Sequence, residues 1–110
     1  MVEQRQSPRR IFKTRALLAM EGEGPVAGRT ADLGAHGVSV NLPAPLKPGQ
    51  SGQVAFDLMV DGKGVKVSAR STVQYCILSN GEFKVGLQFV NLELAAMTAL
   101  ARFLRQGSPG

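Results

Sequence analysis

Residues 54–90 have the sequence VAFDLMVDGKGVKVSARSTVQYCILSNGEFKVGLQFV, and most of the expected architecture follows from them. The segment contains three apolar-rich runs separated by two turn signals. Asp61-Gly62-Lys63-Gly64 and Ser79-Asn80-Gly81 are typical of hairpin turns, because Gly and Asn tolerate the positive φ that tight hairpins need. We therefore expect antiparallel strands at 54–60, from 65 toward 78, and at 83–90.

Upstream of this segment the same pattern continues. The chain becomes strand-like at Ile11, meets a turn cluster at 21–25, and is extended again over 26–33. Residues 38–42 (VSVNL) alternate apolar and polar side chains, as a half-buried strand does. A loop follows at 43–49, where three prolines and a glycine exclude a central strand.

Toward the C-terminus the spacing of apolar residues changes from that of a strand to that of a helix. Apolar residues recur at spacings of three and four, which predicts a helix over about 92–106 with an apolar face made of Leu94, Met97, Leu100, Ala101 and Leu104. Six or seven short strands with Gly/Pro turns favour a mainly β protein, a closed antiparallel barrel whose mouth or open face the C-terminal helix covers. With 110 residues, the chain has the length of one domain.

Charge is concentrated at the N-terminus. Residues 1–15 hold five of the basic side chains and one acid, for a local charge of +4 out of a total of +5. Residues 1–10 are polar and without period, so we expect a flexible basic arm there and the barrel with its helix over 11–106. A short positive segment suits a compact anion better than a nucleic-acid polymer. The absence of a signal-peptide pattern and of a long apolar run predicts a soluble, cytoplasmic protein with no direct membrane insertion.

Catalytic machinery is not visible in the sequence. The chain has one His and one Cys, His36 and Cys76, which excludes the clusters that metal sites need. No nucleophile elbow or phosphate-binding loop of the Walker type is present. We therefore expect a binding protein that is not an enzyme and that has no metal or cofactor.

Two motifs are candidates for binding. Arg5-Gln6-Ser7-Pro8-Arg9-Arg10 offers planar guanidinium groups that fit phosphate oxygens and stack on purines, although such a run is also an ordinary solvated charge cluster. Asp32-Leu33-Gly34-Ala35-His36-Gly37 joins two strands, and its carboxylate has the acceptors to bind the N1 and N2 donors of guanine. The alternative for this motif is a tight turn with a capping Asp, and we expect His36 to be a surface turn residue.

Together these motifs resemble the PilZ family, whose signature is R-x-x-x-R in an N-terminal arm followed by [DN]-x-S-x-x-G at a strand junction. Residues 5–9 match the first motif and residues 32–37 the second, except at one position, and the strand at 85–90 followed by a helix resembles the family's last elements. The resemblance implies a six-stranded antiparallel barrel whose arm binds cyclic di-GMP. Its ligand-binding residues would be Arg5, Arg9, Arg10, Asp32, Gly34, Ala35 and Gly37.

The resemblance also implies individual roles. Arg5 and Arg9 would contact phosphate and guanine with Arg10 assisting, Asp32 would bind a guanine edge, and Gly37 would leave room for the base. Arg9 with Lys13 is a competing register for the first motif. Gly34 stands where the family has Ser, and losing one neutral hydrogen bond predicts affinity weakened about fivefold.

The leading hypothesis is therefore a cyclic di-GMP receptor whose arm changes conformation on binding and signals to an unidentified effector protein. The alternative is a PilZ-like interaction module that has lost nucleotide binding. A third interpretation is a basic nucleic-acid-binding barrel, which the scarcity of aromatic residues disfavours. The sequence does not specify the pathway, the oligomeric state, or whether one ligand or a stacked dimer binds.

Overall fold

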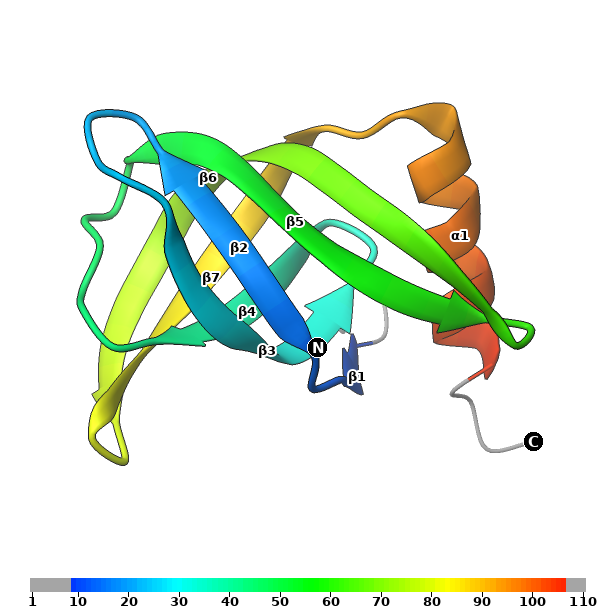
Figure 1. Ribbon diagram of the computed structural model, residues 1–110, viewed down its shortest axis with the longest axis horizontal. Helices are drawn as coiled ribbons and strands as arrows, with labels where there is room; N and C mark the ends of the chain where they lie inside the picture. The colour runs from blue at the N-terminus through cyan, green and yellow to red at the C-terminus, as the bar shows by residue number, and fades with distance from the viewer. Residues whose placement is uncertain (1–8, 107–110) are drawn as a thin grey trace, which may run out of the picture.

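The computed structural model describes residues 9–106, which form a closed barrel of six antiparallel strands, one strand outside it and one helix (Figure 1). The sheet order is β1-β3-β2-β5-β6-β7-β4, and pairing of β3 with β4 closes the ring. The elements are β1 (Arg9–Ile11), β2 (Arg15–Met20), β3 (Val26–Gly34), β4 (Gly37–Leu42), β5 (Ser51–Val60), β6 (Lys63–Ser79), β7 (Glu82–Asn91) and α1 (Leu94–Gln106). The predicted six-stranded barrel with a C-terminal helix is confirmed.

The two hairpins expected in the second half are two-residue turns. Asp61 and Gly62 join β5 to β6 with φ of 53° and 79°, and Asn80 and Gly81 join β6 to β7 with φ of 53° and 80°. Positive φ at both central positions is the geometry that matches the twist of paired strands. These turns fix the registers Val60↔Lys63 and Ser79↔Glu82, and with them the face on which each side chain of β5–β7 lies.

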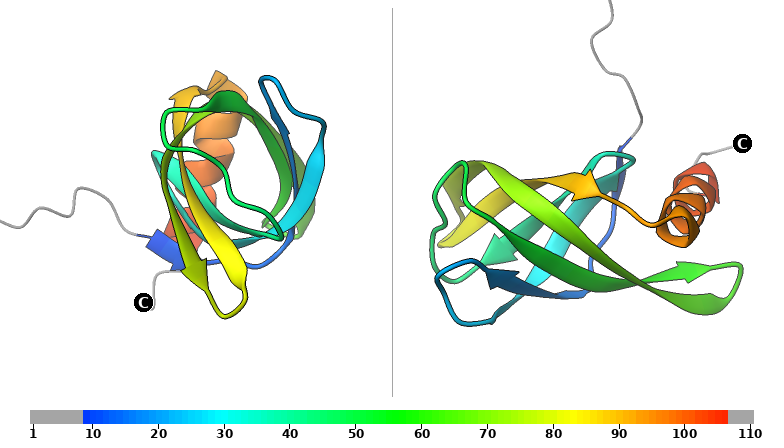
Figure 2. Two further views of the ribbon diagram at one scale, coloured as in Figure 1. Left: turned by 90° about the vertical axis from the view of Figure 1, so that its left-hand side faces the viewer. Right: turned by 90° about the horizontal axis from the view of Figure 1, so that it is seen from above.

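The core fills the barrel interior with alternate residues of every barrel strand. In β4, for example, Val38, Val40 and Leu42 are buried, while the side chains between them face outward. Most members of the core are aliphatic, with Phe56 and Phe103 near the end that the helix covers. Figure 2 shows the barrel end-on in its left view, with α1 behind the ring of strands.

The buried face of α1 differs from the predicted one. Leu100 is buried as expected and Leu104 packs against the core while partly buried, but Leu94, Met97 and Ala101 are exposed. The other buried residues of the helix are Ala96, Ala99 and Phe103. The two alanines bring the helix close to the strands, and Phe103 then fills the barrel mouth against Phe12, with ring centroids 4.9 Å apart. Spacing alone favoured the larger side chains, so the predicted face was rotated from the real one.

The N-terminal boundary also differs from the expectation. Arg9 and Arg10, assigned to the flexible arm, lie in β1, which pairs with β3 through Arg9↔Gly34 and Ile11↔Asp32. The reason is that β3 extends beyond β2, which leaves backbone groups free for pairing. The Thr30 hydroxyl bridges the gap between β1 and β2, accepting from Thr14 N at 2.9 Å and donating to the Phe12 carbonyl.

Candidate functional site

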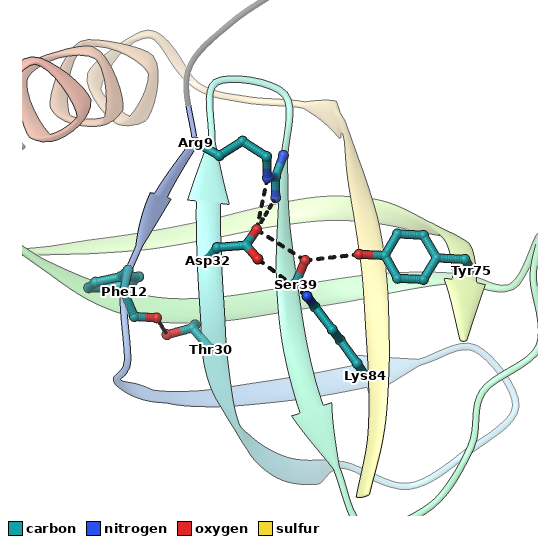
Figure 3. A network of polar contacts seen from close by, with 7 residues as sticks. All are labelled: Arg9, Phe12, Thr30, Asp32, Ser39, Tyr75 and Lys84. Carbon is teal, nitrogen blue, oxygen red and sulfur yellow. Dashed lines mark hydrogen bonds and ion pairs between the residues drawn. The ribbon is translucent and has the colours of Figure 1, made fainter. Parts of the chain in front are cut away.

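A row of outward-facing residues crosses four strands of the barrel at the level of β1. Asp32 on β3 is opposite Ser39 on β4, Ser39 is opposite Gly86 on β7, and Gly86 is opposite Tyr75 on β6. Bulges in β3 near residue 31 and in β6 near residue 74 set these registers. Figure 3 shows the polar side chains of this row connected in one network with Arg9 and Lys84.

The Asp32 carboxylate is the centre of the network. Arg9 donates from Nε to Oδ1 at 2.8 Å, and its Nη2 lies 2.6 Å from the same oxygen. Lys84 Nζ approaches Oδ2 at 3.6 Å, and the Ser39 hydroxyl donates to Oδ1 at 3.2 Å. The Asp32 side chain is 22% exposed, so it remains partly accessible to solvent. Two cations and a hydroxyl thus hold an acceptor group at a defined point of the surface.

Ser39 extends the network to a tyrosine. Its hydroxyl shares a hydrogen bond of 3.1 Å with the Tyr75 hydroxyl, and Ser39 itself is only 2% exposed although it is on the outer face. Asp32 and Tyr75 cover it from its two sides (Figure 3). The chain of contacts therefore runs without a break from Arg9 to Tyr75, across the outer surface of β3, β4 and β7.

The two motif glycines have separate structural roles. A Cβ on Gly34 would lie 2.8 Å from Nη1 of Arg9, so the guanidinium occupies the space that a side chain there would need. A Cβ on Gly37 would lie 2.2 Å from the Leu87 carbonyl oxygen, which means that Gly37 allows β4 and β7 to approach. Only the first of these two contacts involves the far end of a side chain, and it is the one that a substitution can displace at low cost.

A pocket of about 370 Å³ adjoins the network on the outer face of β4, β6 and β7. Residues that line it include Arg9, His36, Gly37, Ser39, Tyr75 and Gln88. His36 is exposed in the bend between β3 and β4, in agreement with its expected place in a surface turn. The pocket is thus formed by the candidate motif on one side and by residues of the last two strands on the other.

Not every predicted site residue reaches this face. Arg10 is directed away from it: Nη1 donates to the Phe103 carbonyl at 2.7 Å, and the guanidinium lies 4.0 Å above the Phe103 ring. Ala35 is half-buried in the β3–β4 bend and does not line the pocket. Arg5 lies outside the described residues. Arg9, which both possible registers of the first motif share, is the motif arginine that the structure places on Asp32.

Three residues of the network were not identified from the sequence: Ser39, Tyr75 and Lys84. Alternation along β4 gives Ser39 an outward direction, and that signal was available. The positions of Tyr75 and Lys84 depend on the register of β6 and β7, including the bulge near residue 74. A bulge of this kind has no clear sequence signature here, which is why the pairing partners of the motif were not found.

This face carries several hydrogen-bonding groups of both polarities. It presents a carboxylate acceptor, a guanidinium that can donate several hydrogen bonds, and hydroxyl and amide groups around a pocket. Within residues 9–106 no group of three His, Cys, Asp or Glu side chains is placed to hold a metal ion. In the same part of the chain, no helix has the length and apolar character needed to cross a bilayer.

Comparison with known proteins gives a family match. The model of the PilZ domain matches residues 3–106. The Bacillus subtilis inhibitor of motility, MotI/DgrA, has a similar structure with a TM-score of 0.86 at 15% identity, covering 96% of this chain and 51% of that one. The PilZ domain of YcgR from Escherichia coli, solved with c-di-GMP, gives a TM-score of 0.72 at 14% identity, covering 96% and 92% of the two chains.

A third similar structure is the PilZ domain of CeSA from a cellulose-synthesizing bacterium, with a TM-score of 0.57 at 22% identity and coverage of 91% and 97%. This chain spans about half the length of MotI/DgrA. At these identities the solved structures establish the fold alone. Among curated proteins no relative matches.

Proposed function

The chain belongs to the PilZ domain family, and we propose that it is a receptor for cyclic di-GMP that passes the binding event to a partner protein. The observation that carries the proposal is the pairing of Arg9 with Asp32 at the edge of a surface pocket. These two residues come from the two family motifs, which are more than twenty positions apart in the sequence, and they meet on one face of the barrel. The proposed role is binding without catalysis.

On binding, contacts of the ligand with Arg9 and with Asp32 would replace the contact between these two residues. The N1 and N2 donors of a guanine match the two oxygens of Asp32, and the guanidinium of Arg9 matches a phosphate or the O6 and N7 acceptors of a base. The Arg9 and Asp32 side chains are 44% and 22% exposed. A pair with this exposure contributes at most about 1 kcal/mol, so opening it costs less than the new hydrogen bonds to the ligand contribute. Lys84 and Ser39 would keep Asp32 in place while Arg9 turns to the ligand.

Signalling would depend on the segment that carries Arg9. We expect Arg5 to join Arg9 on the ligand. Arg9 itself lies in β1, whose other side contacts α1 through Arg10. A partner protein that contacts the surface around β1 would therefore meet different surfaces in the free and bound states.

A second candidate function is an interaction module that does not bind the nucleotide. The specific observation in its favour is Gly34, which lacks the hydroxyl of the family motif and leaves space for Arg9 to cover Asp32. If the contacts with the ligand were too weak to open this pair, the barrel would act through protein contacts alone. Isothermal titration calorimetry with cyclic di-GMP separates the two functions.

The test compares the intact chain with two arginine variants. We expect saturable heat for the intact chain and an affinity at least about 30-fold weaker for Arg9→Ala, because a charge-assisted contact worth about 2 kcal/mol is lost. Arg102→Ala is the matched control, since Arg102 is also an exposed arginine paired with an aspartate, Asp61, at 3.4 Å, but it lies on α1. Equal affinity of Arg9→Ala and Arg102→Ala would refute the proposed site, and absence of heat for the intact chain would favour the interaction module.

A further inference from the structure

The Tyr75 side chain lies across the outer surface of β7, over Gly86. A Cβ on Gly86 would be 2.1 Å from Cε2 of the tyrosine ring and 2.5 Å from its Cζ. The ring therefore occupies the space above the β7 backbone that any other residue at position 86 would fill. Figure 3 shows the side chain extending from β6 toward β4, with its hydroxyl directed at Ser39. Its position is thus fixed at both ends.

One side of this ring is left uncovered. Tyr75 is 38% exposed and lines the pocket that begins at Arg9. The five phenylalanines of the chain are buried or half-buried, and the chain has no Trp. Within the part of the chain that the structure describes, Tyr75 is thus the one exposed side chain among Phe and Tyr, and it lines the pocket together with the exposed imidazole of His36.

The spacing between Tyr75 and Asp32 suits a planar base. Only the Ser39 hydroxyl separates them, at 3.2 Å from Asp32 and 3.1 Å from the Tyr75 hydroxyl. A bicyclic base whose N1 and N2 edge binds Asp32 would cover Ser39 and extend over β7, where Tyr75 lines the pocket. An aromatic ring that is preorganised in this way contributes stacking without a further loss of side-chain freedom.

From this arrangement we propose that Tyr75 is a ligand-contacting residue, which stacks on the guanine that Asp32 binds. The proposal rests on the proposed cyclic di-GMP binding and extends it to β6 and β7, outside both motifs. Gly86 is then a positioning residue, because its missing side chain lets the ring lie flat on β7. The alternative is that Tyr75 only covers Gly86 and stabilises the strand pair.

The first experiment uses the fluorescence of the protein itself. The chain contains one Tyr and no Trp, so its intrinsic emission reports on Tyr75 alone. Addition of cyclic di-GMP is expected to quench this emission in a saturable way, with the same dissociation constant as calorimetry. Cyclic di-AMP at matched absorbance corrects for light absorbed by the ligand. Calorimetric saturation without any change in the corrected emission would overturn the proposal and leave nucleotide binding itself intact.

The second experiment separates stacking from packing by substitution. Tyr75→Leu fills the space over Gly86 without a π face, and we expect about tenfold weaker binding of cyclic di-GMP, whereas Tyr75→Phe retains affinity within about threefold. Ile77→Ala, at a neighbouring exposed position of the same strand, serves as the control and should bind as the intact chain does. Thermal unfolding of each variant verifies the fold.

Two binding results would contradict the stacking proposal alone. Unchanged affinity of Tyr75→Leu, in a protein that loses binding through Arg9→Ala, would assign the ring to packing. Binding of Tyr75→Phe as weak as that of Tyr75→Leu would assign the effect to the hydroxyl and its contact with Ser39. If neither the intact chain nor any variant binds the nucleotide, both the stacking and the proposed function are refuted.

Discussion

The two adjacent arginines of β1 have opposite environments. Arg9 lies on an open face, 44% exposed in its side chain, and its partner Asp32 is itself accessible. Arg10 points to the other side of the strand, where it donates to a carbonyl in the last turn of α1 and covers the Phe103 ring. Alternation of side chains along a strand makes this division unavoidable once β1 pairs with β3.

The difference is one of accessibility and packing. The Arg9 contact is solvent-accessible, and ion pairs of this kind contribute little to stability. The Arg10 contact combines a charge-assisted hydrogen bond, a cation–π contact and a favourable position at the C-terminal end of a helix. Under the proposed function, Arg9 would serve binding, while Arg10 serves packing.

The largest effect is expected on the open face, from Asp32→Ala. The substitution removes both acceptor oxygens, which leaves the N1 and N2 donors of the guanine without partners. We expect cyclic di-GMP affinity to fall by about 2–3 kcal/mol, roughly 30- to 150-fold, in calorimetry. Asp57→Ala is the control, because Asp57 is also an aspartate paired with a lysine, Lys66, at 3.5 Å on the barrel surface. Equal affinities of the two variants would place the ligand elsewhere.

The packing role of Arg10 is tested by measuring the stability of variants. Arg10→Ala removes the hydrogen bond to Phe103 and the contact with its ring, so the free energy of unfolding in urea should fall by about 1–2 kcal/mol. Arg9→Ala should change it by less than about 1 kcal/mol. In binding the order reverses, with Arg10→Ala close to the intact chain. Loss of binding in Arg10→Ala with unchanged stability would contradict this division of roles.

The smallest effect is expected at Gly34. Gly34→Ser restores the hydroxyl of the family motif, and Gly34→Ala adds the same Cβ, 2.8 Å from Nη1 of Arg9, without the hydroxyl. Both substitutions move the tip of the Arg9 side chain, so the ratio of their affinities isolates the hydroxyl. We expect the Ser variant to bind cyclic di-GMP about fivefold more tightly than the Ala variant. Identical titration curves of the two variants would mean that a hydroxyl at position 34 does not contribute to binding.

Much of the fold was predictable because turn chemistry and alternation are local signals. The Asp61-Gly62 and Asn80-Gly81 turns were identified from residue type, and both have the expected positive φ. The helix face was predicted only in part, through Leu100 and Leu104, since the approach of α1 also depends on Ala96 and Ala99, which carry a weak hydrophobic signal. Pairing of Arg9 with Gly34 was missed for a similar reason: it depends on how far β3 extends beyond β2.

The site was predictable in part. The motifs identified Arg9 and Asp32, which the structure brings together. They also suggested Arg10, whose side chain extends from β1 to contact α1 instead. Whether a residue of a three-residue strand faces one side or the other is set by tertiary pairing, not by its own type. Tyr75 is more than forty residues from Asp32 in the sequence, and only the β6–β7 register, with its bulge, places it nearby.

The most direct measurement is an NMR titration of the arginine side chains with cyclic di-GMP. The Nε–H resonances of Arg9 and Arg10 are assigned with Arg9→Lys and Arg10→Lys variants. We predict that the Arg9 resonance shifts in proportion to ligand saturation while the Arg10 resonance moves far less, since its partner is the Phe103 carbonyl. A shift of Arg10 with Arg9 unchanged, or no shift of either at high micromolar ligand, would contradict the proposed division between the two arginines.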